Sequence, residues 1–153
     1  MSNTYTQIHI QTIFAVQNRS CLIGNKWQEE LYKYMTGIIQ NHQHKVLAIG
    51  GISDHIHIFI GMRPTQSISD LMQDVKGNSS KWINEKGFLQ GHFSWQTGYG
   101  AFSYSRSHVS KVIDYINNQA EHHHKVTFIE EYISLLKKFE VSYNSEYLFK
   151  PID

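Results

Sequence analysis

Apolar residues recur at every second position along parts of the chain, which is the spacing of a half-buried strand. The first such segment contains Ile8, Ile10, Thr12, Phe14 and Val16. Two later segments are rich in valine and isoleucine, and a fourth has aromatic residues between glycines, which favours a strand with a bulge. The pattern therefore predicts four strands, at Tyr5–Val16, Lys45–Ile52, Asp54–Met62 and Ser94–Ser105.

Apolar residues at spacings of three and four predict helices between and after these strands. The first helix should end near His42, and the second should pass Ile83 and stop at Gly87. Side chains that can cap a helix mark the expected starts, namely Asn25, Ser67 or Ser69, Ser107, and Thr127 in a capping box with Glu130.

The elements follow the order strand, helix, strand, strand, helix, strand, and then helices. A short turn at Ser53–Asp54 suits the connection between the second and third strands. This order is typical of an α+β, ferredoxin-like or RRM-like fold, a βαββαβ antiparallel sheet with helices on one face, here with added C-terminal helices. The length of 153 residues, without repeat or linker, predicts a single domain over residues 1–153. Such a fold hosts many functions and does not identify the activity.

The composition indicates a globular protein but does not indicate what the protein binds. Hydrophobic residues make up 41% and charged residues 18%, as in an ordinary globular chain. The net charge of +1 predicts neither a nucleic-acid nor an acidic partner. No apolar run approaches the roughly 20 residues of a membrane helix, and the first residues lack a signal peptide. We expect a cytoplasmic protein without a membrane partner, and we assign no role to the one cysteine, Cys21.

Two histidines provide the first candidate chemistry. His55 and His57 lie two residues apart on a predicted strand, so both imidazoles project from one face and can converge on a divalent ion. Two ligands do not complete a metal site. The competing interpretation is that one or both histidines are polar residues on the solvent face of the sheet.

A tyrosine and a glutamine provide the second candidate. Tyr115 and Gln119 lie four residues apart in the third predicted helix and therefore share a face. If this helix packs on the histidine strand, Gln119 could be a third metal ligand and hold Tyr115 beside the ion. Taken alone, Tyr115 also fits a core or surface aromatic and Gln119 a solvated amide. Oxygen and nitrogen ligands favour Mg²⁺ or Mn²⁺ over a structural zinc ion.

Together these motifs resemble the HUH-superfamily single-tyrosine transposases of insertion sequences that move as single-stranded DNA, and their relatives associated with repetitive extragenic palindromes (REP). In that superfamily two histidines flank a hydrophobic residue, as in His55-Ile56-His57, and accompany a helical Tyr-x-x-x-Gln, here Tyr115 to Gln119. The stretch Trp95–Ser103 also resembles the family segment before the catalytic helix. The resemblance extends from the first strand to the end of the third helix. It departs at Ser53, where the family commonly has proline.

The resemblance implies a DNA transposase that nicks and joins single-stranded DNA. Tyr115 would be the nucleophile, forming a 5′-phosphotyrosine and a free 3′-hydroxyl, while His55, His57 and Gln119 would hold the metal ion. It further implies recognition of DNA hairpins at element ends, and a homodimer in which the tyrosine helix of one subunit can serve the histidines of the other. No base that would take the Tyr115 proton is evident from the sequence.

The sequence gives weaker indications of DNA contacts. Aromatic side chains could stack on unpaired bases, although core positions are favoured for Trp95, Tyr99 and Phe102. We expect the run His122–His124 to lie on the surface at a helix end. Basic side chains near the motifs could contact phosphates or simply be solvated, and these are Lys76, Lys81, Arg106 and Lys111.

Three other functions stay open on the sequence alone. A non-catalytic RRM-like module would stack sheet aromatics on bases, although RNP signatures are absent. A domesticated relative of the same family would cut host palindromic repeats without moving an element. A metal-dependent hydrolase would use water, so its Tyr115→Phe variant would still cleave DNA.

Overall fold

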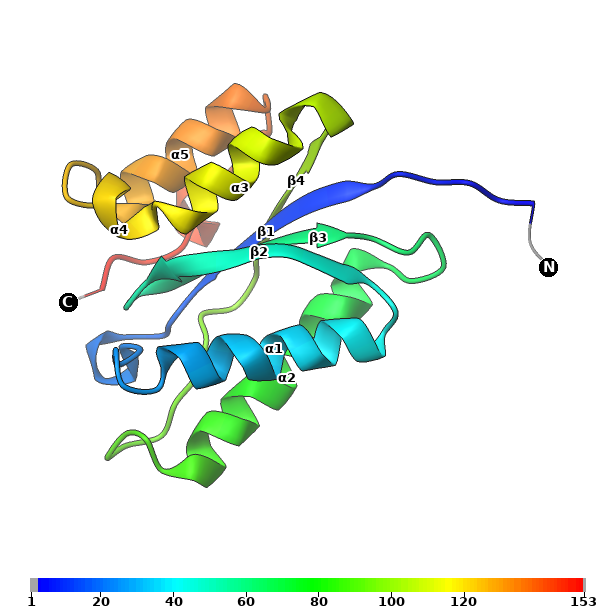
Figure 1. The fold of residues 1–153 in the computed structure, drawn as a ribbon. Helices are drawn as coiled ribbons and strands as arrows, with labels where there is room; N and C mark the ends of the chain where they lie inside the picture. The colour runs from blue at the N-terminus through cyan, green and yellow to red at the C-terminus, as the bar shows by residue number, and fades with distance from the viewer. Residues whose placement is uncertain (1–2, 153) are drawn as a thin grey trace.

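The computed structural model describes residues 3–152, and a four-stranded antiparallel sheet forms its centre (Figure 1). The strands are β1 (His9–Ala15), β2 (Lys45–Ile52), β3 (His55–Gly61) and β4 (Gly100–Tyr104). Their order across the sheet is β2-β3-β1-β4, so β1 pairs with both β3 and β4. This topology confirms the predicted ferredoxin-like fold.

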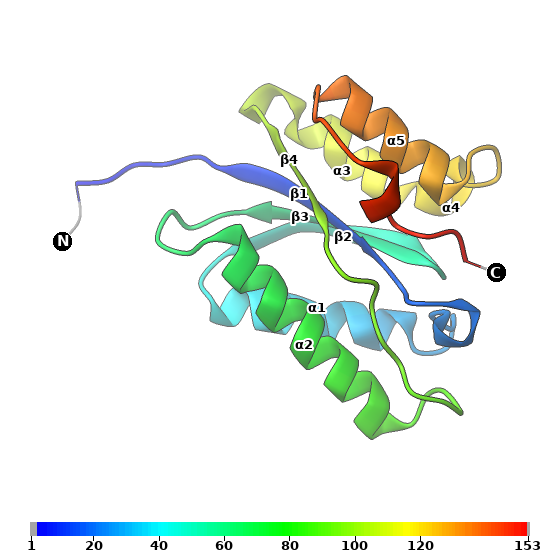
Figure 2. The same cartoon turned by 180° about the vertical axis from the view of Figure 1, so that it is seen from behind.

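Helices cover both faces of the sheet (Figures 1 and 2). One face carries α1 (Gln28–Asn41) and α2 (Ile68–Lys86). The other face carries α3 (Val109–Asn117), α4 (Gln119–His122) and α5 (Phe128–Lys138). Because both faces are covered, every residue of β1 from Ile10 to Ala15 is buried. The prediction that this strand is half-buried is therefore wrong.

β3 presents different side chains to the two helical layers. Ile56, Ile58 and Ile60 are buried in the larger core, which they share with α1 and α2. Phe59 projects from the opposite face, as His55 and His57 do, because side chains alternate along a strand. A smaller core forms there around Phe59, from Ala48, Val109, Val112 and Ile116. The alternation therefore places both histidines beneath the C-terminal helices.

Several predicted helix boundaries are confirmed by their caps. The Ser67 side chain accepts a hydrogen bond from the Asp70 N–H at the start of α2, and Gly87 ends this helix with a left-handed φ of 68°. Thr127 and Glu130 form the predicted capping box of α5. Neither α2, the longest helix, nor any other helix within residues 3–152 has the length and hydropathy to span a membrane.

The predicted starts of the first and fourth strands are both wrong. The first strand has no partner strand before His9, and the chain bends before the fourth strand. β1 begins at His9 rather than Tyr5, because β3 and β4 both end opposite His9. β4 begins at Gly100 rather than Ser94. The positive φ of Gly98, 92°, interrupts the extended chain before it, and Trp95 makes only an isolated bridge to Val16, directly after β1.

Two predicted helix caps are also wrong. Asn25 lies in a turn and does not cap α1, which begins after Trp27, a buried ring stacked on Phe88. Ser107 lies inside a 3-10 turn that precedes α3. Its hydroxyl bonds the hydroxyl of Ser105 at 2.9 Å rather than a backbone N–H, so it satisfies no helix donor.

Gly50 of β2 allows α3 to lie very close to the sheet. A Cβ atom at this position would lie 2.5 Å from the carbonyl oxygen of Ile116. Gly50 is also the strand partner of His57. The missing side chain therefore lets the helix that carries Tyr115 approach the histidine strand.

The substitution Gly50→Ala should destabilise the fold by about 1–3 kcal/mol, because the added methyl group overlaps backbone that cannot easily move. Gly77 in α2 is the control, since a Cβ there meets nothing within 4 Å. Gly77→Ala should stabilise the protein by about 0.5–1 kcal/mol through helix propensity. Urea denaturation followed by circular dichroism measures both changes. A wild-type free energy of unfolding for Gly50→Ala would contradict the close packing of α3.

Candidate active site

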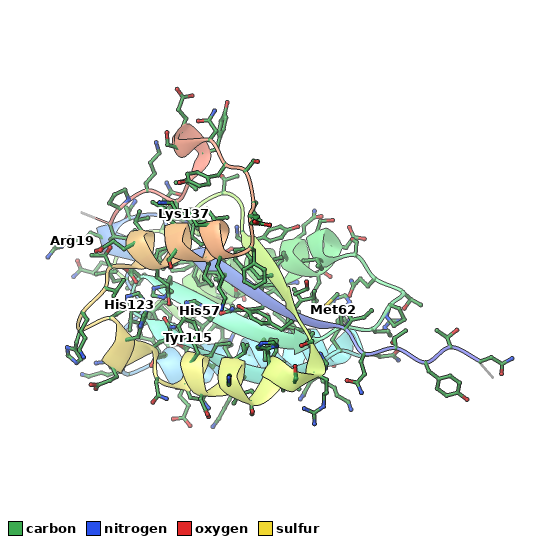
Figure 3. All side chains as sticks on the ribbon, turned by 90° about the horizontal axis from the view of Figure 1, so that it is seen from above. Arg19, His57, Met62, Tyr115, His123 and Lys137 are labelled. Atoms are coloured by element: carbon green, nitrogen blue, oxygen red, sulfur yellow. The ribbon has the colours of Figure 1, made fainter. Side chains whose placement is uncertain are left out.

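His57 lies in the layer between the sheet and the C-terminal helices (Figure 3), and His55, two residues earlier on β3, faces the same layer, with its Nε2 beside Gln119 of α4. Both side chains have no exposed surface, so the interpretation that they face solvent is wrong. Their ring centroids are 4.9 Å apart. The two imidazoles are therefore side by side, as the spacing on the strand predicts.

A separate acceptor orients each imidazole. The Nδ1 atom of His55 donates to Asp54 Oδ1 at 2.7 Å, and the Nδ1 atom of His57 donates to Gln11 Oε1 at 2.6 Å. Gln11 is itself fixed, because its Nε2 donates to the Tyr104 hydroxyl at 2.9 Å. With both Nδ1 atoms engaged, the Nε2 atoms face the interior of the cluster, where a metal ion could bind them.

Tyr115 and Gln119 do meet at this cluster, although not on one helix. α3 ends at Asn117, and Asn118 breaks the helix before Gln119 begins α4. Gln119 Oε1 nevertheless lies 3.0 Å from His55 Nε2. The Tyr115 ring centroid lies 5.8 Å from that of His57. The structure thus brings together all four residues that the sequence singled out.

Sequence reasoning missed Glu131, which lies at the centre of the cluster with 3% of its surface exposed. Its Oε1 atom is 3.1 Å from His57 Nε2 and 3.5 Å from His55 Nε2. Its Oε2 atom accepts hydrogen bonds from Gln119 Nε2, at 3.0 Å, and from the Tyr115 hydroxyl. A signal was present in the sequence, since Glu131 is a charged residue within the buried stripe of α5.

His123 is a second residue that the sequence placed wrongly. It was expected on the surface, but its side chain is only 3% exposed and its Nε2 lies 3.1 Å from Glu131 Oε1. His122 is partly exposed, 3.5 Å from the same carboxylate, while His124 is exposed as expected. The helix break and the following loop turn His123 inward, where Nδ1 donates to the Val126 carbonyl at 2.5 Å.

The surroundings shift the pKa values of the two strand histidines in opposite directions. Burial lowers the pKa of His55, but hydrogen bonds to Asp54 and Glu131 outweigh it and raise that pKa to about 9. Burial dominates for His57 and, despite the contact with Glu131, lowers its pKa to about 4. Burial raises the pKa of Glu131, but the hydrogen bonds of the two histidines lower it overall.

Two overlapping groups of side chains could hold a metal ion. One consists of His55, His57 and Glu131, and the other of His122, His123 and Glu131. Within each group the possible ligand atoms lie within 4.8 Å of one another. Imidazole nitrogens with a carboxylate and the nearby amide oxygen of Gln119 form a donor set suited to a divalent ion. The site residues therefore fit the metal that the resemblance implies.

A groove of about 390 Å³ opens beside this cluster. Tyr115, His122 and Glu131 line it, together with the basic residues Lys111 and Lys138. The tyrosine is thus accessible from a surface that carries positive charge.

Only one of the four predicted phosphate contacts, Lys111, lines this groove. Lys76 and Lys81 line another groove, of about 870 Å³, along α2 on the opposite side of the sheet. The Nζ atom of Lys76 donates there to the carbonyls of Gln96, at 2.9 Å, and Gly98, at 2.5 Å. Arg106 lines neither groove.

The aromatic residues of the predicted fourth strand lie mostly in the core. Trp95 is 8% and Phe102 3% exposed, and both belong to the larger core. Tyr99 is partly buried against the same core. The core interpretation is confirmed for Trp95 and Phe102, so neither offers a face for base stacking.

The chain and its fold are similar to those of other proteins described as transposases. The profile of the family described as "Transposase IS200 like" matches residues 4–119. The fold is similar to the crystal structure of a candidate transposase from Deinococcus radiodurans R1, with a TM-score of 0.62, 19% identity, and coverage of 78% of this chain and 95% of the other. It is also similar to a REP-associated tyrosine transposase bound to a REP hairpin, with a TM-score of 0.60, 13% identity, and coverage of 100% and 93%. No curated protein matches the chain significantly.

The opposite pKa shifts predict different charge states for the two strand histidines in the metal-free protein. At pH 6.5 His57 should be neutral, because this pH lies above its pKa of about 4. His55 should be protonated at the same pH, because its pKa is about 9. Two-dimensional ¹H–¹⁵N NMR of the imidazoles distinguishes these forms, with Asp54→Asn and Gln11→Leu used for assignment. Identical charge states at pH 6.5 would contradict the arrangement of acceptors around the rings.

Proposed function

Because the chain belongs to the IS200-like transposase family, we propose that it is a DNA transposase that cuts and rejoins single-stranded DNA through Tyr115. The convergence of the Tyr115 hydroxyl, two histidine Nε2 atoms and Gln119 on one buried cluster carries the proposal. These groups come from β3, α3 and α4, so local sequence alone does not bring them together.

His55, His57 and Gln119 would hold Mg²⁺ or Mn²⁺ in this proposal. A divalent ion supplies charge neutralisation on the non-bridging oxygens of the scissile phosphate. The protein contributes the orientation of its ligands, because Asp54 and Gln11 fix the Nδ1 sides of the two rings.

Tyr115 would then carry the covalent step. The Tyr115 hydroxyl loses its proton as its oxygen attacks the phosphorus, the bond from phosphorus to the 3′-oxygen breaks, and the departing 3′-oxygen takes up a proton. The products are a 5′-phosphotyrosine and a free 3′-hydroxyl. Attack by a 3′-hydroxyl on this linkage restores a phosphodiester and releases the phenol, which leaves more readily than an alkyl alcohol.

The groove beside Tyr115 is the proposed path for the DNA strand. Lys111 and Lys138 on its walls can contact phosphates. Recognition of DNA hairpins is also part of the proposal, because a structurally similar REP-associated transposase is bound to a REP hairpin. A homodimer is proposed from the family resemblance. Within one chain, Tyr115 already lies beside His57.

Replacing Tyr115 by Phe should abolish the covalent protein–DNA adduct and lower strand cleavage by at least about 10³-fold, because the nucleophilic oxygen is lost. The substrates are single-stranded oligonucleotides carrying the palindromes that flank the gene, with Mg²⁺ or Mn²⁺, analysed on denaturing protein gels. Tyr34→Phe, on α1 across the sheet, should form the adduct at the wild-type level. Cleavage that persists in Tyr115→Phe would instead indicate hydrolysis by water.

Replacing His57 by Gln should lower cleavage by about 100-fold or more, because the metal ion loses one ligand and neutralises the charge of the phosphate less well. Chelation by EDTA should stop cleavage by the wild-type protein, and added Mn²⁺ should restore it. His124→Gln is the matched control, since His124 is exposed. Wild-type cleavage rates in EDTA would exclude metal-dependent chemistry.

A further inference from the structure

We infer that Glu131 of α5 is a fourth ligand of the divalent metal, completing a site formed by His55, His57 and Gln119. This inference rests on the proposed function, since it concerns the same metal. The family match ends at residue 119, so it assigns no role to Glu131 or to α5. The argument comes from distances, burial and charge around this carboxylate.

The distances between the four side chains fit ligands of one ion. His57 Nε2 and Glu131 Oε1 are 3.1 Å apart, and His55 Nε2 and Gln119 Oε1 are 3.0 Å apart. His55 Nε2 and Glu131 Oε1 are 3.5 Å apart. An octahedral ion with bonds of about 2.1 Å places neighbouring ligand atoms about 3 Å apart. These three pairs of donor atoms are therefore already close to the spacing of neighbouring ligands on one ion.

The charges around Glu131 also favour a cation. Within residues 3–152, the groups that approach this carboxylate as ion-pair partners are all histidines, with no lysine or arginine among them. An ionised carboxylate that is almost fully buried is costly without positive charge beside it. A histidine supplies such charge only when protonated, whereas a divalent ion supplies it with neutral imidazoles. A divalent ion bound by the two imidazoles would therefore supply the positive charge that this buried carboxylate needs.

Glu131 would also connect the metal to the nucleophile. Its Oε1 atom faces the histidines while its Oε2 atom accepts a hydrogen bond from the Tyr115 hydroxyl. One carboxylate thereby fixes the tyrosine oxygen relative to the ion. A site with two imidazoles and two oxygens should bind Mn²⁺ more tightly than Mg²⁺, because imidazole ligands suit transition metals.

Calorimetric titration of the DNA-free protein with Mn²⁺ tests this inference without relying on cleavage. Glu131→Gln should weaken Mn²⁺ binding by at least about tenfold, while Glu131→Asp, which keeps a carboxylate, should lose less. Glu121→Gln on α4 removes the same charge from an exposed position and should bind like the wild type. Mn²⁺ binding by Glu131→Gln that equals or exceeds that of the wild type would overturn the inference, and tighter binding would indicate a carboxylate that blocks the site.

A second measurement uses only the wild-type protein, in case Glu131→Gln does not fold. Infrared difference spectra of protein with ¹³C-labelled glutamate should show a labelled carboxylate band that shifts when Mn²⁺ binds. If no labelled band shifts while Mn²⁺ binds, Glu131 is not a ligand. If the wild type and His57→Gln both fail to bind Mn²⁺, the proposed metal site itself fails. Loss of binding in His57→Gln but not in Glu131→Gln would overturn only the role of Glu131.

Discussion

The arrangement of the C-terminal helices depends on satisfying polar groups that are buried against the sheet. The two oxygens of Glu131 contact groups from β3, α3 and α4. A buried polar group that loses its partner costs about 1–3 kcal/mol, so these groups hold one another in place. In the part of the chain that the structure describes, no buried side-chain nitrogen or oxygen lacks a hydrogen-bond partner. This polar network adds to the apolar contacts of Phe59 and Ile116 in positioning α3 to α5.

Helices cover both faces of the sheet, and the polar cluster lies in the layer on the side of α3 to α5. The larger core contains apolar side chains between the sheet and α1 and α2, such as Ile56 and Ile58, and it also includes apolar residues of α5. The opposite layer accommodates the polar cluster beside a smaller apolar core. Alternation along β3 assigns successive residues to these two layers, so one strand contributes to both. A change in strand register by one residue would exchange the two sets of side chains.

Much of the fold and part of the candidate site follow from local patterns in the sequence. Period-two and three-to-four spacings predict the sheet and main helices, and strand alternation brings His55 and His57 together. Glu131 and His123 could not be found this way, because their contacts join residues 74 and 8 positions apart through tertiary packing. The helix break at Asn118 likewise has no glycine or proline to mark it. The start of β1 is set by where β3 and β4 end, and a local sequence pattern carries no information about partner strands.

The complete burial of His55 and His57 also affects how tightly a substrate can bind. The groove beside Tyr115 reaches Glu131, but neither of these histidines lines it. If a phosphate reaches an ion on the histidines only when α3 and α5 move apart from the sheet, then only the open form of the protein binds it. When the competent form is a small fraction of the molecules, the apparent dissociation constant rises by the inverse of that fraction. Each additional 1.4 kcal/mol or so that favours the closed form weakens apparent binding about tenfold. In that case, a more stable helical layer would mean weaker apparent binding of the substrate.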